Sequence, residues 1–133
     1  MKALSAKTTA GINIGSLVNA ADNSGARIVK IVGVKRKKVV RGRQVSCKIG
    51  DWVKVSVRKG KPEMKGEVFD AVVVRQRKPW RRLTGERIAF TDNAVALLKD
   101  EFGNPKGTQI KGPVAREIVE RWEPVAKIAR MAV

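Results

Sequence analysis

One stretch of this sequence carries an unusual density of positive charge. Six of the nine side chains in residues 35–43 are cationic: Lys35, Arg36, Lys37, Lys38, Arg41 and Arg43. Ammonium and guanidinium groups at this density bind the phosphate oxygens of nucleic acids. The alternative, a solvated hairpin tip, is less favoured because the neighbouring segments supply no acidic residues to pair with these charges. We therefore predict that this stretch is a basic ribbon or loop that contacts RNA.

A second basic stretch surrounds a tryptophan. Residues 75–82 contain five cations, and the site predicted here consists of Arg75, Arg77, Lys78, Trp80, Arg81 and Arg82. The indole of Trp80 either stacks on an exposed base or the sugar–phosphate backbone, or packs back on the protein. The cations favour RNA in both cases.

A third candidate site is a glycine-rich loop near the C-terminal end. Its cations are Lys106, Lys111 and Arg116, and its glycines permit close backbone approach to a ligand. A helix expected to begin at Pro113 would add an N-terminal end that favours anions.

Three further residues lie outside these basic stretches. Trp52, on the outward face of a predicted strand, suggests a surface covered by RNA or protein. Trp122 is interpreted as a packing anchor for the terminal segment, and Cys47 as a half-buried strand residue.

The composition argues against catalysis and for a polyanionic partner. The 133 residues include no histidine, no tyrosine and one cysteine, which removes the commonest general base and leaves no cysteine-based metal site or intrachain disulfide. We expect no enzyme activity and no cofactor.

The net charge of +17 is unevenly distributed along the chain. Residues 1–60 hold 14 basic and 2 acidic residues, and residues 61–133 hold 15 basic and 10 acidic residues. A chain without an apolar run long enough to span a bilayer is expected to be cytoplasmic, with no membrane partner.

The elements expected to position these sites are mostly short strands. Strands are predicted over residues 16–20, 26–34, 52–58, 68–75, 87–90 and 94–98, the last two paired across the turn at 91–93. Short helices are expected from Pro113 and Pro124, with a strand as the alternative for the second. The fold class is therefore mainly β, a small five-stranded β-barrel with a short C-terminal helical lobe. Within this single domain, residues 1–15 form an N-terminal extension, 16–102 the barrel and 103–133 the C-terminal loop and helices.

Four stretches in fixed order carry a family resemblance. They are Val18-Asn19-Ala20-Ala21-Asp22-Asn23-Ser24-Gly25-Ala26, Val57-Arg58-Lys59-Gly60-Lys61-Pro62-Glu63, Ala71-Val72-Val73-Val74-Arg75-Gln76-Arg77-Lys78, and Gly107-Thr108 through Gly112-Pro113-Val114-Ala115-Arg116-Glu117. In these stretches the chain resembles the universal large-subunit ribosomal protein L-fourteen family, archaeal/eukaryotic type.

The resemblance implies a structural constituent of the large ribosomal subunit, located in cytoplasmic ribosomes. It implies a five-stranded barrel docked on large-subunit rRNA and intersubunit bridges with small-subunit rRNA. Its other implied partners are neighbouring large-subunit ribosomal proteins and the anti-association initiation factor six. Matching motif positions imply RNA contacts by Arg75, Arg77, Lys78, Lys106, Lys111 and Arg116.

Two other functions compete with this interpretation. A free single-strand-binding barrel of the cold-shock type needs several aromatics on one sheet face, and the six aromatics here are dispersed. A membrane-surface protein needs a basic amphipathic helix, and only short helices are expected. Replacing Arg75, Arg77 and Lys78 with alanine is expected to impair incorporation into subunits while leaving the isolated fold intact.

Overall fold

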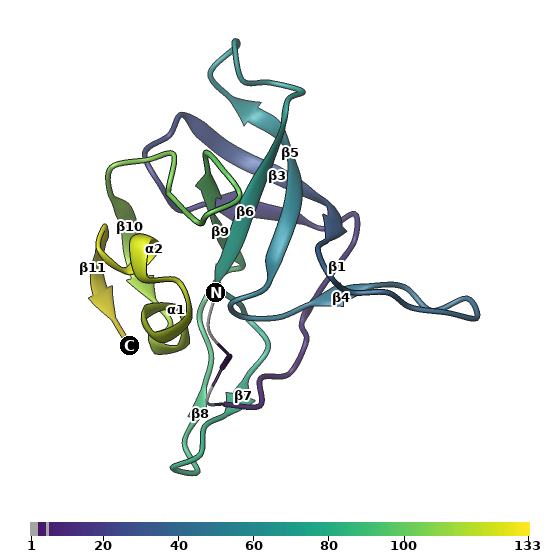
Figure 1. Ribbon diagram of the computed structural model, residues 1–133, viewed down its shortest axis with the longest axis vertical. Coiled ribbons are helices and arrows are strands. Elements are labelled where there is room, and N and C mark those ends of the chain that lie inside the picture. Colours follow the sequence, from purple (N-terminus) through teal and green to yellow (C-terminus); the bar gives the residue numbers. More distant parts are fainter. Residues whose placement is uncertain (1–2, 5) are drawn as a thin grey trace.

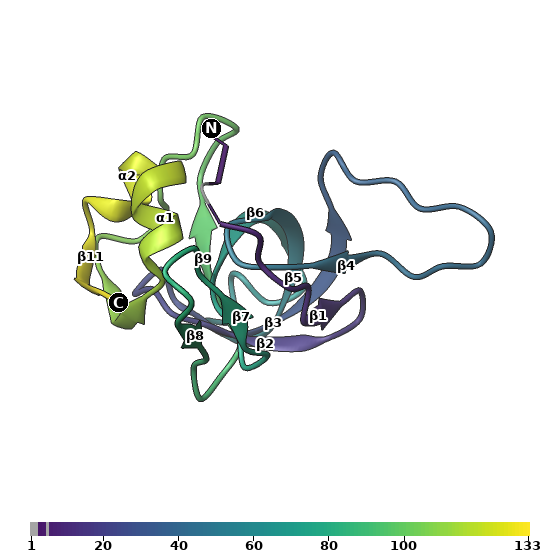
Figure 2. The same ribbon diagram turned by 90° about the horizontal axis from the view of Figure 1, so that it is seen from below.

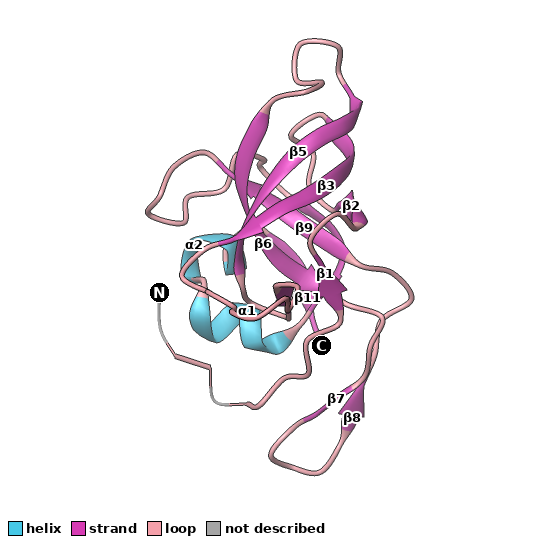
Figure 3. Ribbon diagram, turned by 90° about the vertical axis from the view of Figure 1, so that its right-hand side faces the viewer, coloured by secondary structure: helices cyan, strands magenta, loops and turns pink. Residues whose placement is uncertain are grey.

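The centre of the protein is a closed five-stranded β-barrel (Figures 1 and 3). The computed structural model describes residues 3–4 and 6–133. The barrel strands are β2 (Leu17–Ala20), β3 (Ala26–Val34), β5 (Trp52–Gly60), β6 (Val68–Arg75) and β9 (Ala94–Leu98). Neighbouring strands are antiparallel except where β9 closes the barrel against β2 in parallel. The predicted mainly β fold with a five-stranded barrel is confirmed.

The core follows from the alternation of the strand sequences. Val53, Val55 and Val57 of β5 all point inward with no exposed surface, as their period-2 spacing predicts. The run Ala71 to Val74 in β6 is buried on both faces, because the C-terminal lobe covers the side that faces away from the barrel.

The predicted pairing of residues 87–90 with 94–98 is wrong. Both edges of β9 are already occupied, by β6 on one side and β2 on the other, so a further strand has no free edge to join. Instead β8 (Arg87–Ile88) pairs with β7 (Trp80–Arg81) in a short separate hairpin.

The expected N-terminal extension lies against the body of the protein over part of its length. Strand β1 (Ile12–Asn13) pairs with β4 (Ser46–Cys47), and Thr8 and Ile12 are buried. Met1, Lys2 and Ser5 of this extension lie outside the described residues. The boundaries proposed at residues 15 and 102 remain predictions.

The C-terminal lobe comprises β10 (Ile110–Val114), α1 (Arg116–Arg121), α2 (Glu123–Ala126) and β11 (Ala129–Ala132). The expected helix start at Pro113 is wrong, because Pro113 belongs to β10 and pairs in parallel with Met131. The anion-favouring helix end expected there is lost with it. The second predicted helix is confirmed in part: it forms with Pro124 in its first turn but ends at Ala126. The strand left as its alternative begins three residues later, at Ala129, as β11.

Three segments project from the barrel in different directions (Figure 1). They are the loop between β3 and β4, the loop between β5 and β6, and the β7–β8 hairpin. Figure 2 shows the first of these extending from the side of the barrel opposite the two helices.

Candidate nucleic-acid interface

The basic loop, residues 35–43, is the longest projection and its outer half is a row of exposed cations. Lys38, Arg41 and Arg43 are exposed, and the ion pairs of the described residues include none of them. Arg41 has a φ of 57° and is followed by Gly42 at 72°, so two consecutive left-handed residues make the turn at the tip. Positive φ is uncommon for arginine and concentrates at functional loops.

The base of the basic loop is held by its own lysines. The Nζ atom of Lys35 lies 3.3 Å from a carboxylate oxygen of Asp70 and 3.8 Å from the centre of the Trp52 ring. Lys37 donates a hydrogen bond of 2.6 Å to the carbonyl oxygen of Ser46. These two cations orient the loop, which leaves the outer ones available to a ligand.

The second predicted cluster divides into exposed and internal residues. Arg77, Lys78 and Arg81 are exposed. Arg75 is only 8% exposed, and its guanidinium donates hydrogen bonds of 3.0 and 3.2 Å to Asp92. Further bonds of 2.8 and 3.1 Å go to the carbonyls of Lys111 and Pro113. Arg75 therefore joins the barrel to the C-terminal lobe, and its donors are not free for RNA.

Trp80 and Arg82 are internal as well, which decides between the two environments left open for Trp80. The Trp80 side chain has no exposed surface, and its Nε1 donates a 3.1 Å hydrogen bond to Glu117. Arg82 donates to both oxygens of the same carboxylate and, at 2.6 Å, to the carbonyl of Val133. Burial by itself raises the pKa of Glu117, but the hydrogen bonds from Arg82 and Trp80 outweigh it and hold that pKa below its ordinary value.

The third group of predicted residues is exposed but spread over three elements. Lys106 lies in the loop before β10, Lys111 in β10 and Arg116 at the start of α1. The Nζ atom of Lys106 lies 5.0 Å from the centre of the Phe69 ring. Gly112 has a φ of 80°, which L side chains rarely adopt, and a Cβ there would lie 2.6 Å from Nη1 of Arg75, an atom held by hydrogen bonds to the carbonyls of Lys111 and Pro113.

Several residues of the stretches that carry the family resemblance connect distant segments of the chain through hydrogen bonds. Asn23 accepts the backbone N–H of Thr108 at 2.8 Å and donates to its hydroxyl at 2.7 Å. Asp22 accepts the N–H of Leu97 and the hydroxyl of Ser24, although burial raises its pKa above the ordinary value. These contacts fix the turn at 22–25 against the loop that presents Lys106.

A further group of exposed cations surrounds the β5–β6 loop and was not predicted from the sequence. Lys61 donates its N–H to the Gly25 carbonyl at 3.0 Å, which joins this loop to the turn at 22–25. The sequence signal was the run Lys59-Gly60-Lys61, which lies in one of the four stretches that carry the family resemblance but was not predicted to contact RNA. The exposed cations at this end are Arg27, Arg58, Lys59, Lys61 and Lys65.

Trp122 is a packing anchor, as predicted. It is 4% exposed and its Nε1 donates a 2.8 Å hydrogen bond to the Gly50 carbonyl. Trp52 is half-buried and meets Trp122 edge-on, with ring centres 6.2 Å apart. Cys47 is fully buried in β4, more than the half-burial expected. None of the described helices is long and apolar enough to cross a membrane.

Comparison with known proteins agrees with the resemblance. The family model described as "Ribosomal protein L14p/L23e" matches residues 11–133. Three relatives are each named "Large ribosomal subunit protein uL14". Those of Nanoarchaeum equitans and Halorubrum lacusprofundi are 54% and 50% identical over 133 residues, covering all of both chains. That of Caldivirga maquilingensis is 50% identical over 127 residues, covering 94% of this chain and 88% of the relative. On these matches and its barrel, the chain belongs to the ribosomal protein L14p/L23e family and is a structural component of the large ribosomal subunit, not an enzyme.

Proposed function

We propose that this protein binds large-subunit rRNA through the exposed cations of its projecting segments. The observation that carries the proposal is the outer half of the basic loop, where Lys38, Arg41 and Arg43 extend into solvent without a carboxylate partner in the described part of the chain. Arg77, Lys78 and Arg81 extend the surface beside the β7–β8 hairpin, and Lys106, Lys111 and Arg116 extend it over the C-terminal lobe.

The electrostatic repulsion among these unpaired charges supports the proposal of a phosphate-rich partner. A net charge of +17 on 133 residues repels itself within a compact domain. Phosphate contacts remove that repulsion and release counterions, so affinity comes mainly from the RNA backbone and recognition from RNA shape. Arg75, Trp80 and Arg82 are left out of the proposed contacts because they are internal.

A salt titration against an rRNA fragment that contains the docking site tests this proposal. Six to ten phosphate contacts weaken binding by about a thousandfold or more between 50 and 200 mM salt. Replacing Lys38, Arg41 and Arg43 together with alanine is expected to make the log–log salt slope shallower by about three, one for each lost contact. Lys127→Ala is the control, an exposed cation that is not among the residues proposed to contact RNA. An affinity independent of salt would refute the proposal.

We extend the proposal to intersubunit bridges with small-subunit rRNA. The three projecting segments leave the barrel in different directions (Figure 1), which suits contacts with more than one RNA. Large subunits that carry the triple-alanine loop variant can be mixed with small subunits and followed by light scattering. Slower or weaker association, at equal incorporation of the variant, supports a bridge; unchanged association excludes the basic loop from it.

The remaining proposed partners are neighbouring large-subunit proteins and the anti-association initiation factor six, within cytoplasmic ribosomes. Their support is family membership. A binding assay between the factor and large subunits with or without this protein would test the second partner.

The cold-shock alternative needs several exposed aromatics on one sheet face, and the aromatic side chains here are not arranged in that way. Trp80 and Trp122 are buried, Trp52, Phe69 and Phe90 are partly covered by the core, and the exposed Phe102 lies in a loop. Sedimentation through a sucrose gradient distinguishes the two functions. A ribosomal protein sediments with large subunits, whereas a free single-strand-binding protein stays at the top of the gradient.

A further inference from the structure

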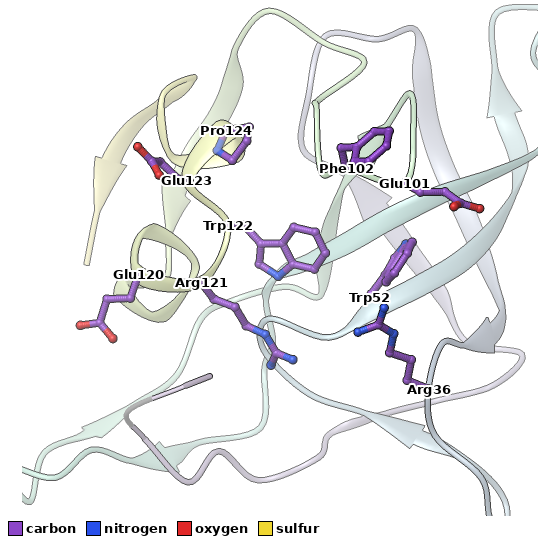
Figure 4. A pocket seen from close by; sticks show the side chains of 9 residues that line it. All are labelled: Arg36, Trp52, Glu101, Phe102, Glu120, Arg121, Trp122, Glu123 and Pro124. Carbon is purple, nitrogen blue, oxygen red and sulfur yellow. The ribbon is translucent and has the colours of Figure 1, made fainter. Parts of the chain in front are cut away.

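Two adjoining hollows lie between the base of the basic loop and the C-terminal helices. The first has a volume of about 350 Å³, and its aromatic lining is formed by Trp52, Phe102 and Trp122 (Figure 4). The second has a volume of about 270 Å³ and lies at the base of the loop. Arg36, Trp52 and Arg121 line both, so the hollows meet along these three side chains. Volumes of this size approach or fall within the roughly 300–1,000 Å³ of small-ligand pockets.

The first hollow, the aromatic hollow, has fixed walls. The Trp122 ring is held by its hydrogen bond to the Gly50 carbonyl, and it packs at 77° against the ring of Trp52. Gly103 lies directly against Trp122, since a Cβ at that position would come within 3.0 Å of the indole. Phe102 next to it is 86% exposed at the rim. Flat, preorganised aromatic faces of this kind stack on nucleobases.

The second hollow, the cationic hollow, suits an anion. Its lining includes five cations, namely Lys35, Arg36, Lys37, Lys48 and Arg121, and one acid, Asp51. Asp51 is already engaged, because its carboxylate accepts the backbone N–H of Lys48 at 3.0 Å. Lys35 is paired with Asp70, whereas the other four cations take part in none of the ion pairs of the described residues. The local excess of positive charge favours a phosphate group.

Two hydrogen-bond donors of side chains that line the hollows lack an acceptor among the described residues. Nε1 of Trp52 and Nε of Arg121 are withdrawn from solvent, and neither has a hydrogen-bond partner in that part of the chain. Buried donors are almost always paired, so an orphaned donor calls for an explanation. Both belong to side chains that line the two hollows, where a ligand can supply the missing acceptor.

We propose that the two hollows together bind one unstacked nucleotide of rRNA, with its phosphate in the cationic hollow and its base in the aromatic hollow. The proposal rests on the rRNA binding proposed above and adds a defined subsite to it. A basic protein segment is the competing occupant, because Glu101, Glu120 and Glu123 also line the aromatic hollow. In Figure 4, however, their carboxylates point away from the Trp122 ring, whereas the guanidinium groups of Arg36 and Arg121 lie beside the two tryptophans.

The indole N–H signals of the full chain provide a direct test. The protein has three tryptophans, so a ¹⁵N-labelled sample gives three such signals, assigned by Trp→Phe variants. Trp80 and Trp122 already donate to Glu117 and Gly50, whereas the Trp52 indole has no acceptor among the described residues. Titration with single-stranded trinucleotides should therefore shift the Trp52 signal most and leave the internal Trp80 signal in place.

Two comparisons complete the experiment. Arg36→Ala should weaken trinucleotide binding roughly tenfold, as expected for one charge-assisted hydrogen bond, and Arg130→Ala, an exposed cation elsewhere, should not. A Trp52 signal that stays still at saturating trinucleotide, or that moves only with a lysine-rich peptide, would overturn the nucleotide subsite. Titrating the same sample with the rRNA fragment distinguishes failure of the subsite from failure of the proposed function. Salt-dependent binding without any shift of the Trp52 signal would refute the nucleotide subsite alone. No binding of the fragment would refute the proposed docking on rRNA.

Discussion

Replacing Arg75 with alanine should destabilise the protein, although it lies in a stretch whose charge suggests an RNA contact. Its guanidinium makes four hydrogen bonds, two to Asp92 and one each to the carbonyls of Lys111 and Pro113. These bonds connect β6 to the turn before β9 and to β10, so the substitution removes the contact at the centre of the join between barrel and C-terminal lobe.

The expected cost is about 3 kcal/mol of unfolding free energy. Removing one partner of a buried ion pair costs roughly 3–5 kcal/mol, because the other partner is left uncompensated. The lower end applies here, since the Asp92 side chain is 30% exposed and water can take over part of its interaction. For a chain of this size, the same loss lowers Tm by about 10 °C.

Urea unfolding followed by tryptophan fluorescence measures the effect, with Arg77→Ala as the matched control. Arg77 is exposed and lies two residues away, so its substitution should change the unfolding free energy by less than about 0.5 kcal/mol. The expectation that the triple variant of Arg75, Arg77 and Lys78 keeps its fold intact is therefore revised: Arg77 and Lys78 report on RNA binding, and Arg75 reports on stability. A loss below about 1 kcal/mol for Arg75→Ala, or an equal loss for Arg77→Ala, would refute this reasoning.

Two further predictions concern buried ionisable groups. The pKa of Glu117 is lowered in the folded protein, so the stabilising contribution of its carboxylate is present above the ordinary pKa of 4.5 and is lost as the pH falls through the folded pKa. Glu117→Gln should therefore make the unfolding free energy, measured by urea unfolding, less dependent on pH on the acid side. An unchanged slope would contradict this prediction. Burial raises the pKa of the Cys47 thiol to about 12. A thiol reagent at pH 8 should therefore label Cys47 only as fast as the protein opens. Labelling at the rate of a free thiol would contradict this prediction, because it would show that the side chain is accessible.

The sequence predicted the barrel well where local pattern and burial coincide. The bounds of β3, β6 and β9 agree with the predicted segments, and the alternating valines of β5 lie inside as expected. The pairing of β9 was missed because strand order depends on which edges remain free after closure. The start of α1 was missed because Pro113 suits both a first helical turn and an edge strand, and the C-terminal strand β11 selects the second.

The sequence by itself determined the overall charge, the β-rich core and the position of the basic loop in the chain, because these depend on composition and on the pattern of neighbouring residues. Only the tertiary structure decided which cations face solvent. Arg75 and Arg82 are as cationic as Arg77 and Arg81 and lie in the same stretch, but closure of the barrel and docking of the C-terminal lobe bring Asp92, Glu117 and backbone carbonyls to the first pair alone. A side chain turns inward when partners from distant segments replace its water, and those partners exist only in the folded chain.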